Sequence, residues 1–152
     1  MVTSRFQIFI GAPPASVFAL LADYAGYAQL PHVKWARVDE RGKEHAAGVG
    51  ALRVLNVDGI TFHERIVEFE EGRVIAYKIE KSSPLRVRHE IGRMVLSERS
   101  GGTDLEWVTT YEAAVPLVSR LLTPVVKWKL ERTFRDILDH AKAQLEARAR
   151  AA

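Results

Sequence analysis

The chain has 152 residues, of which 47% are hydrophobic and 27% charged, as expected for a globular protein that buries a core of its own. It contains no cysteine, which excludes disulfides, thiol nucleophiles and thiolate metal sites. The 22 basic and 19 acidic residues leave a formal net charge of +3, and this small surplus favours a solvated surface over a nucleic-acid interface.

No apolar run approaches the roughly 20 residues of a membrane span. The N-terminus lacks the long apolar core and the small-residue cleavage site of a signal peptide. We therefore expect one domain over residues 1–152, cytoplasmic, with no stable membrane insertion and no nucleic-acid partner.

The N-terminal part predicts one strand and two short helices. Residues 5–10 alternate polar and apolar side chains, which indicates a strand. The run Gly11-Ala12-Pro13-Pro14 ends that strand and begins a helix with Val17, Leu20 and Leu21 on one face. A second short helix is expected to end at Pro31.

From Val33 onward the apolar period changes to two, which predicts a series of strands joined by tight turns. Asp58-Gly59 is a strong signal for a two-residue hairpin turn. Gly48 and Gly50 fall in a loop, where they let the backbone bend at a sheet edge or a pocket mouth. The six predicted strands cover residues 33–38, 51–57, 60–69, 74–79, 86–96 and 103–111.

The C-terminal end, residues 116–148, carries two apolar stripes at helical spacing that are out of phase with each other. The phase changes at Thr123-Pro124, a pair typical of a helix start. This predicts a short lead-in helix, a break or kink, and a main helix from about Pro124 to Arg148. The first stripe is Val118, Leu121, Leu122 and Val125; the second is Val126, Leu130, Phe134, Ile137, Ala141 and Leu145.

The predicted order is strand, two short helices, six hairpin-connected strands and a long helix, which is an α+β architecture. Antiparallel strands twist and curl, and a lone helix cannot bury its stripe in water. A long helix against the concave face of the sheet would enclose a hollow.

Short motifs follow one another in a characteristic order and spacing over nearly the whole chain. These are Ala12 to Phe18; Asp23 with Tyr27 and Pro31; Gly48-Val49-Gly50; Glu64 to Glu68; Ala76 to Ile79; Gly102-Thr103; and Leu105-Glu106-Trp107. In their order and spacing the chain resembles the START-like, Bet v 1-like superfamily (SRPBCC), in its bacterial polyketide cyclase/dehydrase branch.

The resemblance implies a helix-grip fold, in which a seven-stranded antiparallel sheet wraps round the C-terminal helix above a ligand cavity. It also implies function, because members bind lipids, hormones, quinones or polyketides, and some are aromatases or cyclases. The segment from Arg53 to Ile66 is similar to plant abscisic-acid receptors and makes Glu64 a pocket residue. The Ser-Gly-Leu-Pro gate of those receptors is replaced here by Asp58-Gly59.

Strand parity at the Asp58-Gly59 turn predicts which side chains face the hollow. A two-residue turn sets Leu55 opposite Phe62 and Arg53 opposite Glu64. The face is apolar near the turn and is therefore the inner one, so Arg53 and Glu64 are expected to point inward as a cross-strand pair.

The same argument at Gly101-Gly102 predicts that Leu96 pairs with Trp107 and Met94 with Thr109. By the same side-chain alternation, His63 and His89 are expected to face outward. The predicted ligand-binding wall includes aromatic, aliphatic and charged side chains from several strands and the last helix. These are Trp35, Arg53, Leu55, Phe62, Glu64, Tyr77, Arg88, Glu90, Met94, Trp107, Tyr111 and Phe134.

Charged groups are rarely buried unless paired. The two acids and two bases on this wall either satisfy one another beside water, or meet the polar group of a ligand. Trp35 and Tyr77 are equally compatible with a filled core and with a pocket wall.

No histidine has metal-ligand spacing and no nucleophile motif is present, so we expect neither a metal nor a cofactor. The favoured function is binding of a small hydrophobic molecule by a monomer or homodimer. The alternative is a polyketide cyclase or aromatase in which Glu64 acts as acid or base while an arginine polarises a carbonyl.

Overall fold

The protein is described from a computed structural model that covers residues 1–113 and 119–152. In this part of the chain seven strands form one antiparallel sheet, ordered β1-β7-β6-β5-β4-β3-β2, which confirms the predicted α+β helix-grip architecture. The elements are β1 (Val2–Ile10), α1 (Pro14–Ala22), the 3-10 helix η1 (Ala25–Gln29), β2 (Val33–Glu40), β3 (Leu52–Val57), β4 (Ile60–Glu70), β5 (Val74–Ser83), β6 (Val87–Arg99), β7 (Gly102–Ala113) and α2 (Ser119–Ala151).

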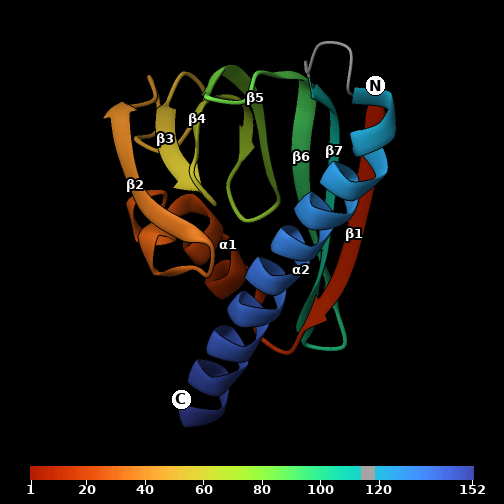
Figure 1. The fold of residues 1–152 in the computed structure, drawn as a ribbon. Helices are drawn as coiled ribbons and strands as arrows, with labels where there is room; N and C mark the ends of the chain where they lie inside the picture. The colour runs from red at the N-terminus through yellow and green to blue at the C-terminus, as the bar shows by residue number, and fades with distance from the viewer. Residues whose placement is uncertain (114–118) are drawn as a thin grey trace.

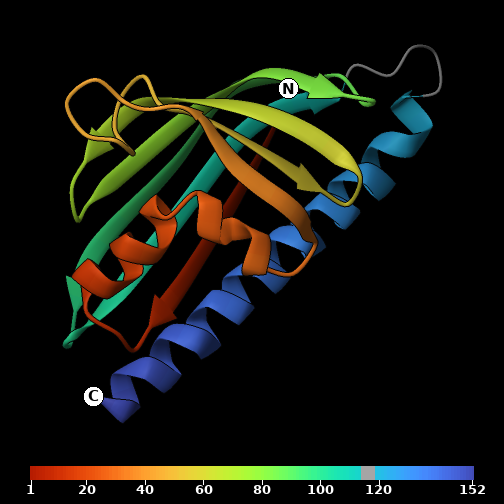
Figure 2. The same cartoon turned by 90° about the vertical axis from the view of Figure 1, so that its left-hand side faces the viewer.

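The sheet curves because antiparallel strands twist, and its concave face receives the helices (Figures 1 and 2). The long helix α2 runs diagonally across this face, while α1 and η1 lie beside it. An aromatic cluster fixes α2 to the sheet: the ring centroids of Trp107 and Phe134 are 4.5 Å apart, and Phe6 lies 5.6 Å from Phe134.

The predicted turn at Asp58-Gly59 is confirmed. Both residues have positive φ, 51° and 90°, as expected of a tight hairpin turn that follows the twist of its strands. Val57 pairs with Ile60, and the register that follows sets Arg53 opposite Glu64.

The predicted turn at Gly101-Gly102 is wrong by one residue. The turn residues are Ser100 and Gly101, with Arg99 paired to Gly102. Leu96 therefore pairs with Leu105, and Met94 with Trp107. The slip relative to the prediction is two residues along β7, and a shift by two leaves Met94, Leu96, Leu105 and Trp107 on their predicted face.

Of the break or kink predicted at Thr123-Pro124, the break is wrong, since α2 continues through Pro124. A proline inside a helix removes only one backbone hydrogen bond, which burial of a long apolar face can outweigh. The start of the predicted lead-in helix, from Pro116 to Val118, lies outside the described residues. The second stripe, from Val126 to Leu145, faces the sheet as predicted.

None of the described helices combines the length and apolar character that a bilayer span requires.

Candidate functional site: an internal cavity with a polar row

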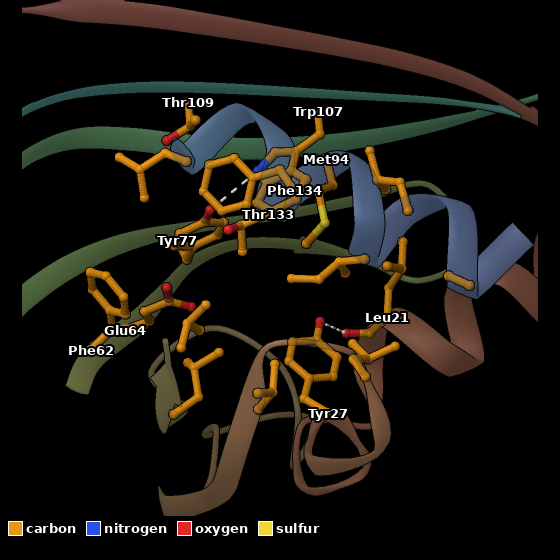
Figure 3. A pocket seen from close by; sticks show the side chains of 18 of the residues that line it. Leu21, Tyr27, Phe62, Glu64, Tyr77, Met94, Trp107, Thr109, Thr133 and Phe134 are labelled. Carbon is orange, nitrogen blue, oxygen red and sulfur yellow. Dashed lines mark hydrogen bonds between the residues drawn. The ribbon is translucent and has the colours of Figure 1, made fainter. Parts of the chain in front are cut away.

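A cavity of about 320 Å³ lies between the concave face of the sheet and α2. Its wall is mainly aliphatic and aromatic, with contributions from β1 to β7, α1, η1 and α2. Figure 3 shows side chains of these elements around one common space. Nine of the twelve predicted wall residues line it: Arg53, Leu55, Phe62, Glu64, Tyr77, Met94, Trp107, Tyr111 and Phe134.

Arg53 and Glu64 form a buried ion pair on the cavity wall. The Arg53 Nε–H donates to Glu64 Oε2 at 2.7 Å, and the two side chains are only 4% and 8% exposed. Burial, the largest single effect, acts to lower the pKa of Arg53, but Glu64 and the surrounding tyrosines together outweigh it and hold the pKa above its usual value. Arg53 therefore stays charged.

Three tyrosines surround the guanidinium group of Arg53. Its Cζ lies 4.6 Å from the ring centroid of Tyr77, 4.8 Å from that of Tyr24 and 5.2 Å from that of Tyr27, which are cation–π distances. Arg53 Nη1 also donates to the Tyr27 hydroxyl at 3.1 Å, which in turn donates to the carbonyl of Leu21. Burial raises the pKa of Tyr27 and Tyr77, so both phenols remain neutral.

Glu64 keeps one oxygen available. Among the described residues only Oε2 has a hydrogen-bond partner, and no buried side-chain oxygen in this part of the chain lacks one. Oε1 must therefore retain contact with the cavity space, which Glu64 lines.

The prediction that Arg88 and Glu90 face the cavity is wrong. Both are exposed, and Arg88 approaches Glu112 at 3.7 Å on the outer surface. The cause is a β-bulge: His89 pairs with Tyr111, but Ile91 pairs with Thr110, so the extra residue inverts the alternation. His89, predicted to face outward, lines the cavity instead.

His89 is held in one orientation by two hydrogen bonds. Its Nδ1 accepts from the backbone N–H of Ile79 at 3.1 Å, and its Nε2 lies 3.0 Å from Thr109 Oγ1. Burial, with the nearby positive charge of Arg53, lowers the pKa of His89 to about 4. The ring is neutral at pH 7, so its proton is on Nε2 and is donated to Thr109.

A glycine could have indicated this irregularity from the sequence. Gly92 lies two residues beyond the bulge, and a Cβ atom there would lie 2.3 Å from Cζ of Tyr77. The missing side chain lets the Tyr77 ring lie flat beside His89, with centroids 5.3 Å apart. A glycine inside a strand is a recognised signal of a bulge or a close approach.

Arg53, Glu64, Tyr77, His89 and Thr109 come from five successive strands, β3 to β7, and form a polar row across the floor of the cavity. Trp35, also predicted to contact ligand, is not part of the wall. It is half-buried on the edge strand β2, where Arg37 lies 4.8 Å from its ring centroid. A register shift between Val33 and Trp35 pairs Trp35 with Asn56, which is not a wall residue, whereas Val33 on the same strand lines the cavity.

The cavity reaches the surface between the β3–β4 turn and α2, where its wall includes the exposed residues Asp58 and Lys129. We call this edge the mouth. Asp58 accepts hydrogen bonds from Thr133 at 3.0 Å and from His32 at 2.9 Å, and the other ring nitrogen of His32 lies 2.8 Å from Asp136. Parity does not predict this cluster, because His32 and α2 are remote in sequence from the turn.

No group of three or more histidine, aspartate or glutamate side chains is placed to hold a metal within residues 1–113 and 119–152.

A curved sheet that grips a long helix above an apolar cavity defines a START-like, Bet v 1-like protein, and the resemblance noted in the sequence is confirmed. The chain belongs to the polyketide cyclase / dehydrase and lipid transport family, whose model matches residues 1–146. No curated protein matches the sequence.

Solved structures with the same fold come from several bacteria. TTHA0849 from Thermus thermophilus superposes with a TM-score of 0.78 at 20% identity, over 96% of this chain and 98% of that one. The Zhui aromatase/cyclase from a Streptomyces species gives 0.77 at 21%, over 99% and 96%. A START superfamily protein from Mycobacterium smegmatis gives 0.75 at 15%, over 94% and 98%. These TM-scores, at identities of 15–21%, show a shared fold and nothing further.

Proposed function

We propose that the protein binds a small hydrophobic molecule in the cavity between the sheet and α2, without chemical turnover. The observation that carries this proposal is the cavity itself, about 320 Å³ lined mainly by apolar side chains with a few convergent polar groups. A filled interior would have been expected of a domain that acts only through its outer surface.

The alternative, a polyketide cyclase in which an arginine polarises a substrate carbonyl, receives less support. Arg53 lines the cavity, but it already donates to Glu64 and to Tyr27 and is enclosed by three aromatic rings. Arg88, the other candidate, is exposed on the outer surface. One structural relative is an aromatase/cyclase, but at 21% identity its activity does not carry over to this chain.

A cavity-filling substitution tests the proposal. Ile79→Trp places an indole in the cavity, whereas Val67→Trp, on the outer face of β4, adds the same side chain where it is 37% exposed in the native protein. Titration with the neutral fluorescent probe N-phenyl-1-naphthylamine should show saturable binding to the wild type and to Val67→Trp.

Binding to Ile79→Trp should weaken at least tenfold, with folding verified by circular dichroism. Native mass spectrometry of the wild type should also show a bound species that Ile79→Trp loses. Equal probe binding by both tryptophan variants would overturn the proposal.

A further inference from the structure

Resting on this proposed function, we infer that the cavity selects neutral ligands, with an apolar body and a hydroxyl group that donates a hydrogen bond to Glu64, over anionic ligands such as fatty acids. The inference comes from the charge and the hydrogen-bonding capacity of the polar row.

The polar row carries no net charge. The positive charge of Arg53 is compensated at 2.7 Å by Glu64. His89 is neutral, because its Nδ1 accepts a backbone N–H and a cation could not do so. Tyr77 and Thr109 complete the row with uncharged hydroxyls.

An anionic headgroup would therefore find no free cation among the described residues of the cavity floor. The guanidinium group of Arg53 already donates hydrogen bonds to Glu64 and to the Tyr27 hydroxyl. The carboxylate of a fatty acid would also come close to the negative charge of Glu64. Burial of a charge without a partner is strongly unfavourable.

The polar row can both accept a hydrogen bond from a ligand hydroxyl group and donate one to it. Glu64 Oε1 is an acceptor without a partner among the described residues, so it can receive the ligand's O–H. The Tyr77 oxygen accepts from Trp107 Nε1 at 3.2 Å and Thr109 accepts from His89, which leaves both of their own protons free to be donated. An alcohol or phenol, donor and acceptor in one group, matches this set. In Figure 3, Glu64, Tyr77 and Thr109 lie along one side of the space.

The size of the cavity limits the apolar body. The space of about 320 Å³ lies near the lower end of the range of small-molecule sites, so it favours a compact ligand such as a medium-chain alcohol or a two-ring phenol.

The experiment compares three ligands of one chain length at pH 7.5: 1-decanol, its methyl ether, which accepts but cannot donate, and decanoate. Each displaces N-phenyl-1-naphthylamine from the protein. We expect 1-decanol to bind at least tenfold more tightly than decanoate and at least threefold more tightly than the ether.

Glu64→Gln leaves the positive charge of Arg53 uncompensated, so it should reduce or reverse the preference for 1-decanol over decanoate. Glu68→Gln is the matched control, since Glu68 lies on the same strand and pairs with Arg93 at the surface. It should leave the preference unchanged.

The comparison in the wild type needs no variant, so a poorly folded Glu64→Gln would not block the test. Decanoate that binds as tightly as 1-decanol overturns the inference. Should Lys129→Met then abolish decanoate binding, the carboxylate lies at the mouth. Loss of all probe binding to the wild type would instead overturn the proposed function, and the two failures are thereby distinguished.

Discussion

The two ends of the cavity use the same kinds of residue in opposite ways. On the floor, the ion pair of Arg53 and Glu64 is almost fully buried, and His89 beside it is kept neutral. At the mouth, the pair of Asp58 and His32 is 30% exposed on each side, and Asp136 completes the contact. The difference teaches that exposure, and not residue type, decides what a charge contributes.

The largest effect is expected from Glu64→Leu, because it leaves the buried charge of Arg53 without its partner. Loss of one member of a buried pair costs about 3–5 kcal/mol of unfolding free energy. Denaturant unfolding measures it. Asp104→Leu, which removes the partner of the exposed Arg99, should cost less than about 1 kcal/mol.

The double variant Arg53→Met with Glu64→Leu should recover most of that loss, because no unpaired charge remains. Equal costs for Glu64→Leu and Asp104→Leu would remove the distinction between floor and surface.

The next largest effect is a decrease of the unfolding free energy at low pH, which comes from His89 on the cavity floor. The pKa of His89 falls from 6.5 in the unfolded chain to about 4 in the folded protein. Below pH 6.5 the unfolded chain therefore binds more protons, and stability must fall as the pH is lowered toward 4. The contribution amounts to about 2–3 kcal/mol between pH 7 and 4.

His89→Gln keeps one acceptor and one donor but cannot titrate. Its stability relative to the wild type, measured by urea unfolding at pH 7, 5.5 and 4, should rise steadily as the pH falls. A constant difference across this range would show that His89 is not the buried neutral group that the structure indicates.

The smallest effect is expected at the mouth, where His32 stabilises the folded protein at low pH instead of at high pH. Hydrogen bonds to Asp136 and Asp58 raise the pKa of His32, although burial acts weakly against them. Its stabilising contribution is complete below about pH 6.5 and is lost as the pH rises through the raised value. Asp58, whose pKa is lowered by these bonds in spite of burial, stays charged throughout, and Lys129 faces it from α2.

Between pH 6 and 9 the unfolding free energy of the wild type should thus fall by about 1 kcal/mol or less, and that of His32→Gln should not show this fall. Thermal unfolding at a series of pH values resolves the difference. A pH dependence identical in the wild type and in His32→Gln would show that the cluster at the mouth contributes nothing measurable.

The sequence by itself determined the order of the elements, the hairpin at Asp58-Gly59 and the burial of Arg53 opposite Glu64. It also determined the stripe of α2 that faces the sheet. These follow from local rules, since turn residues set register and the side-chain period sets the face. Leu55, Phe62, Tyr77, Met94, Trp107, Tyr111 and Phe134 were found in the same way.

Only the tertiary structure decided the rest. The bulge at His89–Ile91 moved Arg88 and Glu90 to the surface and His89 into the cavity, because one extra residue inverts the alternation on the side of the bulge away from the turn. A register shift between Val33 and Trp35 pairs Trp35 with Asn56, so Trp35 lies off the wall although Val33 on the same strand lines it. The contacts of His32 with Asp58 and Asp136 join three segments remote in sequence, which no periodic pattern can encode.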